Sequence, residues 1–97
     1  MKNFKDSLDT AVFTTIFVVT DKKEVTYVTH EFEDEAWQFF SDDQFEDYEK
    51  VSMIVGLGEI IDLDKTLIEI ADLPLGYIAT RQSIRDKWTI EQNINAC

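Results

Sequence analysis

Polar turns divide the first part of the chain into short segments rich in Val, Ile, Thr, Phe and Tyr, which predict β-strands. These segments are residues 12–19, 24–32 and 36–41. The first is apolar on both faces, which favours a central position in a sheet. Only a short polar turn separates it from the second segment, so we expect these two strands to form an antiparallel hairpin.

Successive side chains of the third segment fall on opposite faces of the strand. Trp37 and Phe39 fall on one side of the strand, and Gln38 and Phe40 fall on the other. If only one side of the sheet is covered, one of these faces meets solvent. Phe40 is therefore a candidate apolar anchor for a partner.

In the second half of the chain the spacing of the apolar residues changes to that of a helix. Residues 51–55 predict one more short strand, and residues 57–73 carry apolar side chains at helical spacing. The apolar stripe shifts between Asp62 and Asp64, which predicts two short helices rather than one. The carboxylate of Asp64 can cap the second helix by accepting a backbone N–H.

Two more strand candidates, residues 77–82 and 88–92, follow Pro74 and Gly76. A basic turn with Arg81, Arg85 and Lys87 joins them. We therefore expect one α+β domain over residues 1–97, with a largely antiparallel sheet of about five strands and one or two short helices.

Charge is distributed unevenly along the chain. The formal net charge is −11, and residues 31–49 contain nine acidic side chains and no basic one. We call the nine the acidic block: Glu31, Glu33, Asp34, Glu35, Asp42, Asp43, Glu46, Asp47 and Glu49. Aromatic residues are interleaved with them, which is unlike a disordered acidic tail. This charge disfavours nucleic acid and anionic membranes as ligands and favours a cationic partner.

The candidate chemistry outside the acidic block is sparse. His30 is the single histidine, and the spacing of the serines suggests no Ser–His–Asp arrangement around it. Residues 42–47 lack the glycine and the alternation of a calcium-binding loop. Cys97, the single cysteine, permits no internal disulfide and fits a cytoplasmic location. We assign no catalytic, cofactor-binding or metal-binding residue and expect a protein without enzymatic activity.

About half of the chain resembles a family of small bacterial domains of unknown function, some of which are grouped with the immunity proteins of polymorphic toxin systems. The resemblance runs from Trp37-Gln-Phe-Phe-Ser-Asp-Asp to Leu57-Gly-Glu-Ile-Ile-Asp-Leu-Asp-Lys-Thr-Leu, and then through Ile68-Glu-Ile-Ala-Asp-Leu-Pro-Leu-Gly-Tyr to Arg81. Lys65 stands where the family pattern has a proline. The resemblance implies a small cytoplasmic α+β domain that binds and neutralises a basic toxin domain.

These observations favour a non-enzymatic binding protein, of the immunity type, that meets a basic toxin or effector domain through an acidic face. The predicted partner-binding residues are Glu33, Asp34, Glu35, Asp42, Asp43, Glu46, Asp47, Phe40 and Tyr48. The alternative is a structural or housekeeping interaction domain, for which a homodimer through an exposed sheet edge is an option. A small hydrolase or a metal-dependent protein is the third possibility.

Overall fold

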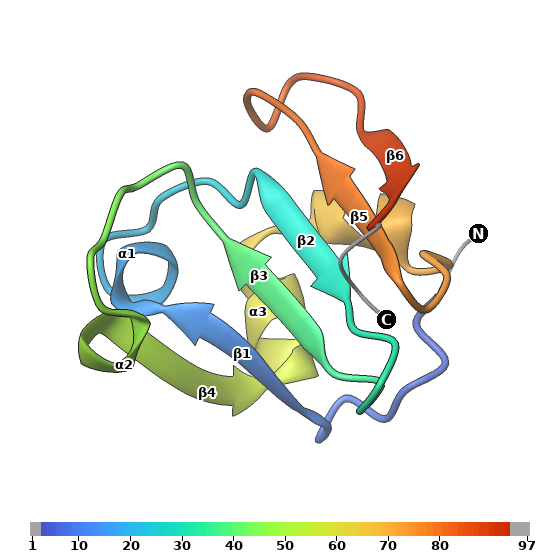
Figure 1. Ribbon diagram of the computed structural model, residues 1–97, viewed down its shortest axis with the longest axis horizontal. Helices are drawn as coiled ribbons and strands as arrows, with labels where there is room; N and C mark the ends of the chain where they lie inside the picture. The colour runs from blue at the N-terminus through green and yellow to red at the C-terminus, as the bar shows by residue number, and fades with distance from the viewer. Residues whose placement is uncertain (1–2, 94–97) are drawn as a thin grey trace.

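The computed structural model describes residues 3–93, which fold into one α+β domain (Figure 1). Its elements are short, and the strands outnumber the helices. In chain order they are β1 (Ala11–Thr15), α1 (Ile16–Val19), β2 (Tyr27–His30), β3 (Trp37–Phe40), α2 (Tyr48–Val51), β4 (Ser52–Gly56), α3 (Leu57–Leu63), the 3₁₀ helix η1 (Lys65–Ile70), β5 (Tyr77–Thr80) and β6 (Thr89–Gln92).

The strands form one six-stranded sheet in the order β4-β1-β3-β2-β5-β6. All neighbouring strands are antiparallel except β1 and β3, which run parallel. The predicted fold class is confirmed, and the sheet has one strand more than the expected five. Because β1 lies between β4 and β3, its predicted central position is also confirmed.

The core lies between one face of this sheet and the helices α3 and η1, which are behind the sheet in the view of Figure 1. Trp37 and Phe39 point into the core and are 1% and 0% exposed. Leu57 and Ile60 of α3 and Leu67 of η1 are buried with them. The alternation in 36–41 predicted that Trp37 and Phe39 share one face of β3, and the structure shows that this is the covered face.

The predicted hairpin between residues 12–19 and 24–32 is wrong. The first strand ends at Thr15, and residues 16–19 form a single helical turn in which the Thr20 amide donates to the Ile16 carbonyl at 2.8 Å. The chain then returns to form β2 on the far side of β3. Tertiary contacts decide the structure of such a β-branched segment more strongly than its intrinsic strand preference does.

The break in the helical region is confirmed. Asp64 separates α3 from η1, and its side chain accepts the Thr66 backbone N–H at 2.9 Å, as expected of a capping residue. The single helical turn α2 follows residues 42–47. It begins at Tyr48 because the Asp47 carboxylate caps it by accepting the Glu49 amide.

Candidate functional site

One face of the sheet is open. The helices α3 and η1 lie on the core side, and Figure 1 shows β1, β3 and β2 uncovered on the side that faces the viewer. Cross-strand partners share a face, so Phe13 lies beside Ile54 of β4 and Gln38 of β3 on this open face. Ile54 is 63% exposed. The open face is thus partly apolar and accessible to another molecule.

At one end of the open face four aromatic rings form a cluster, which we call the aromatic patch: Tyr27, Phe40, Phe45 and Tyr48. The Phe40 ring lies centrally, 6.2 Å from Tyr27, 6.5 Å from Phe45 and 5.6 Å from Tyr48 between ring centroids. Tyr27 and Phe45 are 37% and 41% exposed, whereas the other two are half-buried. Two of the predicted partner-binding residues, Phe40 and Tyr48, are therefore in contact.

The two tyrosines of the patch are held in different ways. The Tyr48 hydroxyl donates to the Thr14 carbonyl at 3.2 Å, and burial raises its pKa above 10.0. Burial also raises the pKa of Tyr27, and the negative charges of Glu31 and Glu91 raise it further. Both phenols are therefore neutral at physiological pH and present an apolar ring with a polar tip, which is a common composition of interface anchors.

Five carboxylates follow β3 directly, on the segment that carries Phe45 and Tyr48. We call this set the acidic loop: Asp42, Asp43, Glu46, Asp47 and Glu49. Local hydrogen bonds fix its shape, since the Ser41 hydroxyl donates to Asp43 at 2.6 Å and Asp47 caps α2. Among residues 3–93 no Lys or Arg forms an ion pair with these carboxylates. Their charge is therefore available to a partner.

The structure does not bring the whole acidic block together. The connection from β2 to β3 carries Glu33, Asp34 and Glu35, and the acidic loop leaves the other end of β3 (Figure 1). A four-residue strand separates them, which corresponds to roughly 13 Å. The predicted partner-binding residues thus fall into two groups, and only the acidic loop adjoins the aromatic patch.

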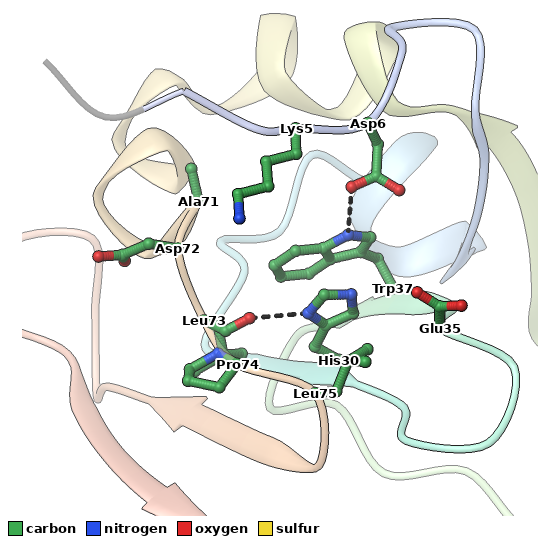
Figure 2. A pocket seen from close by; sticks show the side chains of 10 residues that line it. All are labelled: Lys5, Asp6, His30, Glu35, Trp37, Ala71, Asp72, Leu73, Pro74 and Leu75. Atoms are coloured by element: carbon green, nitrogen blue, oxygen red, sulfur yellow. Dashed lines mark hydrogen bonds between the residues drawn. The ribbon is translucent and has the colours of Figure 1, made fainter.

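A cavity of about 450 Å³ lies at the opposite end of β3 from the aromatic patch, and His30 and Trp37 are among the residues that line it (Figure 2). The two rings stack with centroids 3.9 Å apart, and the indole N–H donates to Asp6 at 3.3 Å. His30 Nδ1 lies 2.7 Å from the Leu73 carbonyl, which can only accept, so this nitrogen carries the proton. In the neutral ring the other nitrogen is then unprotonated and can accept a hydrogen bond.

The lining of this cavity offers little further chemistry. The described residues around it include no Ser, Thr or Cys that could act as a nucleophile beside His30. Within residues 3–93 no group of three or more His, Cys, Asp or Glu side chains is placed to hold a metal ion. Cys97 lies outside the described residues. We derive no reaction from the cavity.

Sequence reasoning missed a buried ionic cluster around Arg81. This side chain donates to Asp64 at 2.7 Å, to Thr66 Oγ1 at 2.8 Å and to the Val25 carbonyl at 3.0 Å. Its guanidinium also lies 4.0 Å from the ring centroid of Trp88. Arg81 therefore neutralises Asp64 rather than the acidic block. The pattern showed only a basic turn, and the burial comes from a contact between residues far apart in sequence.

No family model, curated protein or solved structure matches this chain. Within the described part of the chain no helix has the length and apolar character needed to cross a membrane.

Proposed function

We propose that this protein is a non-enzymatic binding protein, an immunity-type inhibitor that attaches to a basic effector domain. The binding surface is the aromatic patch with the acidic loop. The observation that carries the proposal is that one segment, residues 42–49, carries both unneutralised carboxylates and two rings of the aromatic patch at one end of an open sheet face. Each half of this arrangement has a distinct role in protein recognition.

The acidic loop provides long-range attraction. Five carboxylates without basic partners in residues 3–93 produce a negative field that reaches about one Debye length, roughly 8 Å, at physiological salt. Such fields raise association rates with an oppositely charged protein by about 10-fold to 1000-fold at low salt. The same field repels nucleic acid and anionic lipid.

The aromatic patch provides affinity after encounter. Aromatic side chains surrounded by polar residues are typical centres of interface energy, with losses of about 2 kcal/mol or more on truncation. Phe40 contacts the other three rings of the patch, so truncating it removes support from all of them. We therefore assign Phe40 as the central anchor and Tyr48 as its neighbour.

The test is a capture from the native host at low salt, followed by rate measurements on the protein released by salt. One variant neutralises the acidic loop with Asp42→Asn, Asp43→Asn, Glu46→Gln and Asp47→Asn. The matched control neutralises the other end of β3 with Glu31→Gln, Glu33→Gln, Asp34→Asn and Glu35→Gln. Both variants lose four negative charges, and the Asn side chains still accept the local hydrogen bonds of Asp47 and Asp34.

We expect the loop variant to associate at least about tenfold more slowly at low salt and to lose most of its salt dependence. The control variant should keep most of the association rate because Glu33, Asp34 and Glu35 lie at the other end of β3 from the aromatic patch, and Glu31 is the one carboxylate of the four whose charge acts on Tyr27 of the patch. Equal slowing in both variants would show that only net charge matters. An unchanged rate in the loop variant would refute the proposed surface.

A further inference from the structure

The strand β4 is an unprotected edge of the sheet. It pairs with β1 on one side and has no strand on the other side in the described chain. Its sequence, Ser-Met-Ile-Val-Gly, contains no charged residue and no proline, although natural edge strands usually carry such residues to prevent pairing. By contrast, β6 at the opposite edge carries Glu91.

The backbone groups available at this edge follow from the hydrogen-bond pattern. The Leu57 amide donates to the Thr10 carbonyl at 2.8 Å, one step beyond the Ala11–Gly56 pair of the β1–β4 ladder. Bonded and non-bonded pairs alternate in an antiparallel ladder, so the pair of Phe13 and Ile54 is a non-bonded one. The N–H and C=O of Ile54 therefore point away from β1, into open space at the edge.

Carboxylates stand near both ends of this edge. Asp47 and Glu49 of the acidic loop lie just before β4, at the start of α2. Glu59 follows β4, and Asp9 lies close to it because the Gly58 amide donates to the Leu8 carbonyl at 3.0 Å. All four acids are exposed. Lys50 is also exposed in α2 and offsets one of the two carboxylates before β4. The edge thus offers an uncharged middle and two ends of net negative charge over a length of about 17 Å.

We propose that β4 binds an extended segment of the partner as an additional strand, with apolar residues at its centre and basic residues at its ends. Strand addition supplies affinity through main-chain hydrogen bonds and specificity through alternate side chains. The centre of the added strand meets the Ile54 side chain, and its basic ends meet the carboxylates. This inference relies on the proposed function only for the basic character of the partner.

A second copy of this chain is a poorer occupant of the same edge. Antiparallel self-pairing centred on Ile54 would place Glu49 opposite Glu59 of the second copy, and like charges directly opposite each other are destabilising. Two molecules that each carry a net charge of −11 also repel one another. A basic strand from the partner avoids both of these repulsions.

The test uses defined peptides with the purified protein. The basic probe is acetyl-Lys-Val-Thr-Ile-Thr-Val-Lys-amide, the neutral probe has Gln in place of both Lys, and the blocked probe is the basic peptide N-methylated at its central amides. The readout is hydrogen exchange at the Ile54 amide by NMR, with the Val55 amide as an internal control. Ile54→Pro removes the donor at a position where the N–H faces solvent, and Ile54→Thr keeps it.

At a basic-probe concentration about ten times Kd, we expect Ile54 exchange to slow about tenfold, because exchange then requires the free fraction. The blocked probe should give no protection. Ile54→Pro should raise the Kd of the basic probe roughly fivefold to tenfold, the loss expected for one hydrogen bond. Ile54→Thr should change it much less. The blocked probe is tested on the unsubstituted protein, so this comparison remains informative if the Ile54→Pro variant does not fold.

The outcomes separate the two proposals. Basic-probe binding without Ile54 protection, or equal binding of the blocked probe, refutes strand addition and leaves the acidic surface intact. Equal Ile54 protection by the neutral probe supports strand addition and refutes recognition by charge. Dimerisation of the protein alone, with Ile54 protected in the dimer, would show that the edge serves a second copy and would overturn the inference.

Discussion

The ion pair between Arg81 and Asp64 provides the sharpest prediction about stability. The Arg81 side chain is 0% exposed and that of Asp64 is 7% exposed, with 2.7 Å between Nη2 and Oδ2. Asp64→Ala removes the counter-charge of a guanidinium that cannot reach water. Breaking a buried pair from one side costs about 3–5 kcal/mol, and loss of a helix cap costs about 1 kcal/mol. We therefore expect a loss of roughly 4 kcal/mol in the free energy of unfolding.

The chain offers a matched control for this substitution. Asp62 pairs with Lys65 at 3.8 Å, but the two side chains are 80% and 77% exposed. Asp62→Ala should therefore cost about 0–1 kcal/mol, as exposed pairs do. Asp64→Asn separates capping from charge, because the amide oxygen can still accept the Thr66 N–H. We expect it to cost about 1 kcal/mol less than Asp64→Ala.

The assay is urea unfolding at constant pH, followed by far-UV circular dichroism. Tryptophan fluorescence is unsuitable because the Trp88 ring contacts Arg81 and would respond locally. A double-mutant cycle with Arg81→Met should give a coupling energy of at least about 2 kcal/mol. If Asp64→Ala and Asp62→Ala differ by less than about 1 kcal/mol, the buried pair does not stabilise the fold as argued.

Two further predictions concern backbone conformation and tyrosine ionisation. Gly76 has φ of +82°, and a Cβ there would lie 3.6 Å from Phe32, so Gly76→Ala should lower the free energy of unfolding by about 1–2 kcal/mol through backbone conformation alone. Glu35 has φ of +58°, so Glu35→Gly should raise the stability slightly. Thermal unfolding measures both effects. Tyr27 and Tyr48 have raised pKa values in the folded state, so they contribute stability that is present below pH 10.0 and lost as pH rises through the folded values. Stability should therefore fall above pH 10.0, and less steeply when both are replaced by Phe; an equal fall would contradict this.

The sequence predicted local features well because local patterns determine them. Alternation in 36–41 placed Trp37 and Phe39 on one face, which is buried in the structure, and the break at Asp64 predicted a cap that the structure contains. Strand order could not be predicted in this way. The parallel pairing of β1 with β3 depends on where the chain turns after Thr15, which is decided by packing rather than by the apolar pattern.

The candidate site shows the same division. Period-two alternation predicted that Phe40 lies on the face opposite Trp37 and Phe39, and the structure places Phe40 in the aromatic patch. The acidic block, however, was treated as one face because its residues are close in sequence. A strand in the middle of the block moves its two halves to opposite ends of the sheet. Closeness in sequence therefore overstated closeness in space.

This division of charge bears on how a basic partner would approach. If the acidic groups at the two ends of β3 were equivalent, their attraction would favour no single orientation of the basic partner. They differ, because the acidic loop leads through α2 directly into the edge strand β4, whereas the other group leads from β2 to β3 inside the sheet. The β2–β3 connection also has an exposed aromatic ring, Phe32, beside its carboxylates. Within residues 3–93, however, the acidic loop is the group of carboxylates that leads into the free backbone groups of the edge strand β4. A partner guided there by charge can form both kinds of contact without reorienting.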